Sequence, residues 1–372
     1  MEAPASCKSM NKIRVLVADD SALMRQTLKR IISDSSDLEL AGVARDGEDA
    51  VAKARELRPD VVSMDINMPK LDGISALQMI LEEKICPVVM VSSLTQKGAT
   101  TTFECLELGA FDFVGKPDGT VSSNMGTVAI ELVAKLKAAA RASGSMAQLA
   151  KTRERRARLG TMRFAAVDQD RSATPEKITR QRAVAIGIST GGPATLQDVL
   201  PLIPADIPAS LFLVQHMPPS FISSFTKRLG DSCRMKVVEG RSGMPVEPSV
   251  CYVAPGGMHL CLHRKMTGEI VIRTPTTPVT LFMPSVSVMM DSVLKIYGKD
   301  TIGVLMTGIG DDGADEMVAI RKAGGFTIAE SEETAVVFGM PREAAERGGA
   351  CVVLPSHETA GEIVRAVRRT QK

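Results

Sequence analysis

The sequence has no tryptophan and only two tyrosines among 372 residues, and aromatic residues make up 3% of the chain. Proteins that bind single-stranded nucleic acid stack the bases on exposed aromatic rings, which are scarce here. The 45 basic and 43 acidic residues nearly balance, so no overall field favours nucleic acid or a membrane surface. We therefore expect no nucleic-acid partner. The basic run at residues 151–158 is the local exception, and solvated charge in a linker explains it more simply.

The sequence also lacks the signs of an extracellular or membrane protein. Its seven cysteines are odd in number and none forms a Cys-x-x-Cys pair, which argues against a disulfide framework. No apolar run reaches the roughly 20 residues that span a bilayer. The N-terminal MEAPASCKSMNK has no apolar stretch of the signal-peptide kind. We expect a cytoplasmic protein without membrane insertion.

Two successive α/β patterns are present. From residue 13 to 117, short β-rich runs alternate with stretches of helical period, which predicts a five-stranded parallel sheet with helices on both faces. A second, doubly wound α/β pattern begins near residue 181, and residues 251–275 predict a small antiparallel insertion in it. We expect an N-terminal domain at residues 10–142, a linker at 143–180 and a C-terminal domain at 181–372.

Polar side chains collect at the predicted strand ends of the first domain. Asp19 and Asp20 follow the first strand, Asp65 lies near the end of the third, and Ser92 and Lys116 end the fourth and fifth. In an open parallel sheet these ends share one edge. Clustered carboxylates repel one another unless a cation neutralises them, and Mg²⁺ prefers such oxygen ligands. Any single aspartate could be a helix cap or turn residue, but the joint pattern predicts a metal and anion site.

Over about residues 12–142 the sequence resembles the receiver domain of bacterial response regulators, through VADDS, MDINMPKLDG, VVMVSS and FVGKP. The resemblance implies a flavodoxin-like domain with Asp65 as phosphoacceptor and with Ser92 and Lys116 as phosphoryl contacts. It also implies that Mg²⁺ is bound for phosphorylation by Asp19, Asp20, Asp65 and the backbone carbonyl of Asn67. Phosphorylation would then bias a two-state switch.

A serine lies at a glycine-rich turn early in the second domain. The predicted strand AVAIGI runs into Ser189, a position that exposes a hydroxyl and turns backbone N–H groups outward at a helix N-terminus. An isolated serine at such a turn is more often a helix N-cap. His216 ends the next predicted strand, and Asp311 and Asp312 follow a later one. A general base and an orienting carboxylate are therefore expected at the same edge of the sheet.

The order serine, histidine, aspartate differs from that of the α/β-hydrolases. Over about residues 181–372 the chain is similar to the chemotaxis protein-glutamate methylesterase (CheB) family, through IGISTGGP, QHMPPSF, YVAPGGMHL and MTGIGDDGADEM. The similarity implies the catalytic residues Ser189, His216 and Asp312, with Asp311 a solvated turn residue. It also assigns the oxyanion hole to the backbone N–H groups of Thr190 and Ile309.

The same similarity implies a function. The expected enzyme hydrolyses glutamyl methyl esters on methyl-accepting chemotaxis receptors, releases methanol, also deamidates receptor glutamines, and uses no cofactor in the esterase step. A chemotaxis histidine kinase would be its phosphodonor, and phosphorylation would activate it. One segment departs from the family pattern His-Arg-Pro-Ser-Val-Asp, because this chain reads FMPSVS over residues 282–287. That departure keeps a non-enzymatic scaffold as an alternative. A DNA-binding output is disfavoured by the lack of a helix-turn-helix signature.

Two local patterns offer further alternatives. The loop at residues 308–313 matches the glycine fingerprint of dinucleotide-binding proteins, but its two aspartates would repel a pyrophosphate. His259, Cys261 and His263 alternate along a predicted strand and could mimic a zinc site, although no fourth ligand is evident. We expect neither a dinucleotide nor zinc.

Overall fold

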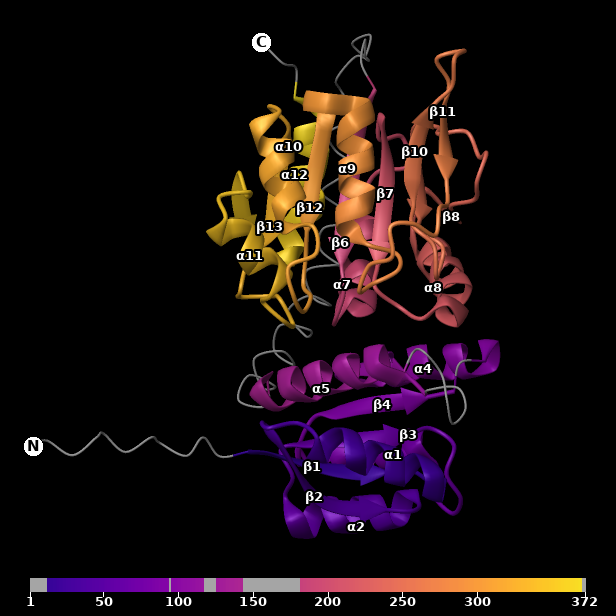
Figure 1. Cartoon of the computed structure of the whole chain (residues 1–372), viewed down its shortest axis with the longest axis vertical. Coiled ribbons are helices and arrows are strands. Elements are labelled where there is room, and N and C mark those ends of the chain that lie inside the picture. The colour runs from indigo at the N-terminus through magenta and orange to yellow at the C-terminus, as the bar shows by residue number, and fades with distance from the viewer. Residues whose placement is uncertain (1–11, 94, 117–124, 143–180, 370–372) are drawn as a thin grey trace, which may run out of the picture. The chain divides into compact units, whose positions relative to one another are not determined.

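The computed structural model describes residues 12–93, 95–116, 125–142 and 181–369. The chain divides into two compact units, one made of residues 1–93 and 101–144 and the other mainly of residues 145–372 (Figure 1). The predicted linker and its basic run lie outside the described residues. In the part of the chain that is described, no helix combines the length and the apolar character that crossing a membrane requires.

The N-terminal unit contains the predicted five-stranded parallel sheet, in the order β2-β1-β3-β4-β5. Strands β3 and β4 are buried along their whole length, which explains their continuous apolar sequences: both faces of the sheet are covered. The strands are β1 (Ile13–Ala18), β2 (Leu38–Ala44), β3 (Val61–Asp65), β4 (Val88–Ser92) and β5 (Asp112–Gly115).

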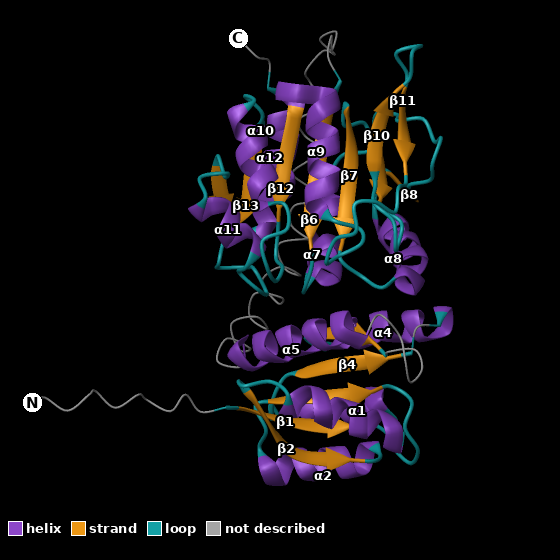
Figure 2. Cartoon of the chain, viewed as in Figure 1, coloured by secondary structure: helices purple, strands orange, loops and turns teal. Residues whose placement is uncertain are grey.

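Helices cover both faces of this sheet because the strand order reverses at β1. Right-handed crossovers on either side of that reversal place the helices (purple in Figure 2) on opposite faces. Helix α1 therefore packs with α5, and α2 packs with α3. The carboxyl ends of β1 and β3 lie side by side at this reversal, the location where open α/β sheets bind ligands. The helices are α1 (Ala22–Ser33), α2 (Gly47–Leu57), α3 (Gly73–Glu82), α4 (Gln96–Leu108) and α5 (Met125–Ala142).

The C-terminal unit is built on a seven-stranded sheet in the order β14-β13-β12-β6-β7-β9-β8, and every pair in it is parallel. The order reverses at β6, as expected for a doubly wound α/β domain. The strands are β6 (Arg182–Ile188), β7 (Ala209–Gln215), β8 (Lys236–Glu239), β9 (Val250–Val253), β12 (Thr301–Leu305), β13 (Phe326–Glu330) and β14 (Val352–Leu354).

The helices of this unit follow most of the strands and return the chain to the sheet. They are α7 (Gly192–Val199), α8 (Pro219–Ser232), α9 (Val286–Tyr297), α10 (Ala314–Lys322), α11 (Met340–Glu346) and α12 (Ser356–Arg368), with 3₁₀ turns η3 (Leu200–Leu202) and η4 (Gly298–Asp300).

The antiparallel insertion is present but shorter than predicted. It consists of β10 (Cys261–Arg264) paired with β11 (Ile270–Arg273). Residues 251–253, which the pattern placed in the same hairpin or meander, instead belong to β9 (Val250–Val253), between β7 and β8. All four residues of β9 are buried, whereas β10 has two exposed residues. A continuously apolar run fits a strand covered on both faces better than a hairpin strand with one wet face.

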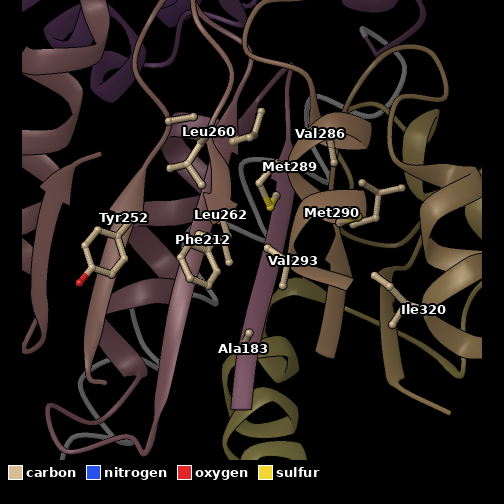
Figure 3. Packing of buried hydrophobic residues seen from close by; sticks show 14 of the residues in the cluster. Ala183, Phe212, Tyr252, Leu260, Leu262, Val286, Met289, Met290, Val293 and Ile320 are labelled. Atoms are coloured by element: carbon tan, nitrogen blue, oxygen red, sulfur yellow. The ribbon is translucent and has the colours of Figure 1, made fainter. Parts of the chain in front are cut away.

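Methionine and aliphatic side chains fill the core between the sheet and α9. Met289, Met290 and Val293 point from α9 toward the sheet, where Phe212 and Tyr252 stack with ring centroids 5.8 Å apart (Figure 3). Close packing fixes the position of α9, and truncating such a buried methionine to alanine costs about 2–5 kcal/mol. The core therefore holds the N-terminus of α9 in one place.

Candidate active site

Three carboxylates and a lysine meet at the carboxyl edge of the N-terminal sheet. The ligand oxygens of Asp19, Asp20 and Asp65 all lie within 4.8 Å of one another. Lys116 Nζ lies 2.9 Å from Asp19 Oδ2 and 2.8 Å from Asp65 Oδ2. Asp19 and Asp65 are buried, and Asp20 is exposed. The structure thus brings these four predicted residues together.

The charges in this cluster are only partly compensated. Burial raises the pKa of the Asp65 carboxyl, and the hydrogen bond and charge of Lys116 offset only part of that rise. Burial also opposes the charge on Lys116, but its hydrogen bonds to Asp65 and Asp19 hold its pKa above the usual range. The Lys116 ammonium contacts two of the three carboxylates, so hard oxygen donors in excess remain for a cation. The residues present fit Mg²⁺.

The other predicted receiver residues lie close by in the chain. Ser92 is buried at the end of β4, and its Oγ accepts a hydrogen bond from the Thr102 hydroxyl of α4 at 2.8 Å. The Lys116 N–H donates to the Ser92 carbonyl at 2.7 Å, which ties the ends of β4 and β5 together. Asn67 is exposed in the loop after Asp65.

Ser189 and His216 lie side by side at the carboxyl edge of the C-terminal sheet. In the pairing of β6 with β7, Ile188 is the partner of Gln215, and Ser189 and His216 are the next residues along the two strands. The His216 N–H donates to the Ile188 carbonyl at 3.1 Å. The Gln215 amide donates to the carbonyls of both Ser189 and His216 at 2.9 Å. The neighbouring strand positions predicted for Ser189 and His216 are therefore confirmed.

The serine turn depends on close backbone approaches. Gly191, with φ 77°, is the N-cap residue of α7, so the alternative that Ser189 caps this helix is wrong. A Cβ on Gly191 would lie 2.5 Å from Val336 Cβ, and one on Gly308 would lie 2.8 Å from Ser189 Cβ. The loop after β12 therefore touches the serine, and Ile309 follows directly on the touching residue. Thr190 is buried beside the serine.

Thr307 links the segments around the serine. Its carbonyl accepts from the Ser189 N–H at 2.9 Å, and its hydroxyl donates to the Thr190 carbonyl at 2.9 Å. Its own N–H donates to the buried carboxylate of Glu330 at 2.8 Å. Thr307 was not among the residues predicted from the sequence, although a polar residue directly after an apolar strand is a visible signal.

Asp312 binds the imidazole of His216, with 2.9 Å between Asp312 Oδ2 and His216 Nε2. The same carboxylate accepts from the N–H groups of Val286 at 2.7 Å and Ser287 at 2.9 Å, and from the Ser285 hydroxyl at 2.9 Å. These donors form the N-terminus of α9, where partial positive charge favours an anion.

The electrostatics of Asp312 follow from these contacts. Burial opposes its charge, but the hydrogen bond and charge of His216 and the backbone N–H groups of α9 outweigh burial and lower its pKa. An ionised Asp312 can only accept, so Nε2 of His216 carries the proton. Nδ1 is buried and has no hydrogen-bond partner within the described ranges. It is the nitrogen that remains for the neighbouring serine.

The donors to Asp312 escaped the sequence analysis. The segment 282–287 was identified only as a departure that loses polar groups. Instead, Ser285 is the N-cap residue of α9, and its hydroxyl serves both Val288 N–H and Asp312. A serine directly before an apolar run was the available signal. The Phe282 ring stacks on the His216 imidazole, with centroids 4.3 Å and planes 14° apart.

The contacts of His259 bear on the zinc alternative. His259 is buried, its Nδ1 accepts from the Ser285 N–H at 3.2 Å and its Nε2 lies 2.8 Å from the Pro278 carbonyl, so no nitrogen is left for zinc. Among the described residues, Asp19, Asp20 and Asp65 form the one group of potential ligands close enough to hold a metal. Asp311 is exposed as predicted, and Arg347 pairs with it at 2.7 Å.

Comparisons with known proteins show the family to which the chain belongs. The CheB methylesterase family model matches residues 184–363, and the response regulator receiver domain model matches residues 15–121. The protein-glutamate methylesterase/protein-glutamine glutaminase 3 of Syntrophomonas wolfei is 58% identical over 96% of this chain and 100% of its own length. Its counterpart from Caldanaerobacter subterraneus is 47% identical over 96% of this chain and 97% of its own. The solved Thermotoga maritima CheB methylesterase catalytic domain is 36% identical and covers 50% of this chain and 99% of its own, with a TM-score of 0.49. The chain belongs to the CheB family of protein-glutamate methylesterases/protein-glutamine glutaminases, with a response regulator receiver domain at its N-terminus.

Proposed function

We propose that this chain hydrolyses γ-methyl esters of glutamyl side chains in methyl-accepting chemotaxis receptors, and that phosphorylation of its receiver domain activates it. The observation that carries the proposal is the His216–Asp312 pair at 2.9 Å, placed beside Ser189 by the pairing of β6 with β7. The names of the close relatives support the substrate class.

Acylation begins with the proton on Ser189. His216 Nδ1 accepts that proton as Ser189 Oγ attacks the ester carbonyl carbon, and the resulting imidazolium is stabilised by ionised Asp312 at Nε2. The negative oxygen of the tetrahedral intermediate is bound by the backbone N–H groups of Thr190 and Ile309. Their position is supported by the contact between Gly308 and Ser189.

The intermediate then collapses. The C–O bond to methoxide breaks, Nδ1 returns its proton to the leaving oxygen, and methanol departs. Water adds to the acyl-enzyme with His216 again acting as base, which frees the glutamate carboxylate and restores the Ser189 hydroxyl. A glutamine side chain follows the same steps with ammonia as leaving group. No step in this sequence uses a cofactor.

In the receiver domain, Asp65 accepts the phosphoryl group from a chemotaxis histidine kinase. Asp19, Asp20 and Asp65, with the carbonyl of Asn67, would hold Mg²⁺, which offsets charge on the transferring phosphoryl group when bound. Lys116 neutralises the phosphoryl oxygens, and Ser92 leaves its Thr102 partner to contact them. The unphosphorylated receiver inhibits the esterase, and phosphorylation relieves that inhibition.

The remaining proposals concern organisation. We propose boundaries of 10–142 for the receiver, 143–180 for a linker and 181–372 for the catalytic domain, in a cytoplasmic protein. A fragment beginning at residue 181 would then have higher basal activity than the whole chain. An equal or lower rate in a folded fragment would contradict the inhibitory role.

The test of the function is methanol release from methylated receptor fragments. The wild type should release methanol, and release should rise when acetyl phosphate and Mg²⁺ are added. Ser189→Ala should lose about 10⁴-fold or more in rate while keeping its fold. Release that survives Ser189→Ala would overturn the assignment of the nucleophile. Release that ignores acetyl phosphate would leave the esterase standing and remove the proposed control.

A further inference from the structure

Phe282 lies against the imidazole that the proposed mechanism uses as base. The two rings are nearly parallel, 14° between planes, with centroids 4.3 Å apart. Phe282 is partly buried, whereas its neighbour Leu281 is 56% exposed, so the chain turns the aromatic side chain inward and leaves the aliphatic one in solvent. Stacking of two such rings is stabilising beyond the area that it buries.

The segment 275–285, which carries Phe282, is fixed by the buried side chain of His259. Its Nδ1 accepts from the Ser285 N–H at 3.2 Å, so the proton lies on Nε2, which donates to the Pro278 carbonyl at 2.8 Å. The His259 backbone N–H donates to the Pro275 carbonyl at 2.8 Å. One neutral histidine thus holds the start, the middle and the end of the segment.

Further bonds act inside this segment. The Thr280 hydroxyl donates to the Phe282 carbonyl at 2.6 Å, and the Gly257 N–H donates to the Met283 carbonyl at 3.2 Å. The backbone on both sides of the aromatic residue is therefore held, and its ring has little freedom to leave His216.

We propose that Phe282 is a positioning residue for His216 and that His259 acts through Phe282, a role that rests on the proposed function of His216 as base. The hydrogen bond from Nε2 to Asp312 leaves Nδ1 for Ser189, but the imidazole can still rotate about that bond. The parallel Phe282 ring sets the plane of the imidazole, because a tilted imidazole would collide with it. The two contacts together aim Nδ1 at Ser189.

The stack also explains the departure at residue 282. An aromatic hydrocarbon ring neither titrates nor forms hydrogen bonds, so it fixes the plane of His216 at any pH without competing for either ring nitrogen. It needs no polar partner of its own, whereas a histidine in this place would. Loss of polar groups in the segment therefore does not imply loss of the catalytic arrangement.

The test uses the full-length chain and a probe that reports Ser189 reactivity without the receptor. Phenylmethanesulfonyl fluoride sulfonylates an activated serine, and its rate is measured by mass spectrometry. Phe282→Leu keeps apolar bulk but loses the flat ring, and it should label about 10- to 100-fold more slowly, since small misplacements of a catalytic group have effects of that size. Phe282→Tyr restores the ring and should recover most of the rate. Leu281→Ala is the matched surface control and should label like the wild type.

Two readouts separate positioning from a merely structural role. In methanol release, Phe282→Leu should lower kcat with KM within about twofold, because the stack aims the base rather than binding the substrate. In ¹⁵N NMR, the two ring nitrogens of His216 should change shift in Phe282→Leu and not in Leu281→Ala. Wild-type labelling and unchanged His216 shifts in Phe282→Leu would overturn the proposal.

A double-mutant cycle tests the role of His259. His259→Gln keeps one acceptor and one donor, so it should retain more of the labelling rate than His259→Leu. If His259 acts through Phe282, the double variant with leucine at both positions should label no more slowly than the slower single variant. Additive losses would overturn this part of the proposal.

Failure of the proposed function gives a different pattern. A Ser189 that labels normally in a chain without methanol release points to another substrate, while labelling and NMR still decide the role of Phe282. Labelling that persists in Ser189→Ala refutes the nucleophile, and the positioning proposal fails with it.

Discussion

The two units place an aspartate at the same kind of location, the carboxyl edge of a parallel sheet, and give it opposite properties. Burial raises the pKa of Asp65, because one lysine does not offset the loss of water and the repulsion of Asp19. At Asp312 burial acts in the same direction, but His216 and the N–H groups of α9 outweigh it and lower the pKa. The number of fixed donors decides the difference.

The difference matches the two proposed roles. A carboxylate that accepts a phosphoryl group must be reactive. Its negative charge is therefore only partly neutralised by the protein, and a bound cation can complete the neutralisation. A carboxylate that orients a histidine must stay ionised and keep one position. Backbone N–H donors at a helix N-terminus provide both. Their shared position at the carboxyl edge of a parallel sheet would by itself have suggested the same role for Asp65 and Asp312.

Replacement of the proposed phosphoacceptor should produce the largest effect. Asp65→Asn removes the carboxylate oxygen that attacks the phosphodonor, so phosphorylation by acetyl phosphate with Mg²⁺ should be lost, as measured by intact-protein mass spectrometry. Labelling of Ser189 by phenylmethanesulfonyl fluoride should be retained, because the substitution lies in the other unit. A stable phosphoryl adduct in the variant would show that Asp65 is not the acceptor.

The corresponding change at Asp312 should reduce catalysis rather than abolish it. Asp312→Asn presents an amide to His216 and to the N–H groups of α9, so the tautomer with the proton on Nε2 loses its ionised partner. We expect kcat for methanol release to fall about 10³- to 10⁴-fold. Asp311→Asn, in the exposed neighbouring residue, should change kcat less than about twofold. Equal losses in the two variants would contradict the assignment.

The two aspartates also differ in how far sequence alone predicts them. The strand-end residues Asp19, Asp65, Ser189, His216 and Asp312 could be located because apolar strands stop abruptly at polar residues, and parallel strands share an edge. The backbone donors that help His216 to lower the Asp312 pKa could not be located in this way. They come from the N-terminus of α9, more than 20 residues before Asp312 in the chain, and depend on how α9 packs on the sheet.

The same limit explains the other differences from expectation. Residues 251–253 were placed in the hairpin because their neighbours 261–275 have that pattern, and only tertiary burial assigns them to the parallel sheet. The stacking of Phe282 on His216 joins residues 66 positions apart, and no local periodicity encodes it.

Acid should reveal the difference between Asp312 and Asp65 in stability. For Asp312 the folded pKa lies below its ordinary value of 3.8, so its contribution is fully present above that pH and is lost as pH falls from 3.8 through the folded pKa. Asp312→Asn should therefore destabilise the C-terminal unit by about 2 kcal/mol at pH 7 and by less below pH 3.8. For Asp65 the folded pKa is raised, so its contribution to the free energy of unfolding falls as pH rises. Urea unfolding followed at several pH values measures both, and a pH-independent deficit in Asp312→Asn would contradict the assignment.

Glu316 allows two carboxyl pKa values to be compared within the C-terminal unit, and a substitution beside it should have the smallest effect. It lies in α10 near Asp312, yet burial raises its pKa as it does for Asp65, and the Ser287 hydroxyl at 2.6 Å offsets only part of that rise. Ser287→Asp would add a further carboxylate beside those of Glu316 and Asp312. We expect kcat/KM for methanol release to fall about two- to fivefold at pH 8 and by less at lower pH, because burial already raises the pKa of Glu316 and protonation of either carboxyl relieves the repulsion.

The isosteric variant Ser287→Asn removes the added charge and serves as the control. It should show a smaller loss that does not depend on pH, because the backbone N–H that binds Asp312 is kept. If Ser287→Asp and Ser287→Asn behave alike between pH 6 and 8, repulsion is not the cause, and the volume of the side chain is. If only Ser287→Asp responds to pH, repulsion between carboxylates is the cause. A buried carboxyl with too few hydrogen-bond donors would then have a raised pKa in either unit of this protein. The same explanation would then cover Asp65 and Glu316, and Asp312 would differ because His216 and the N–H groups at the start of α9 bind it.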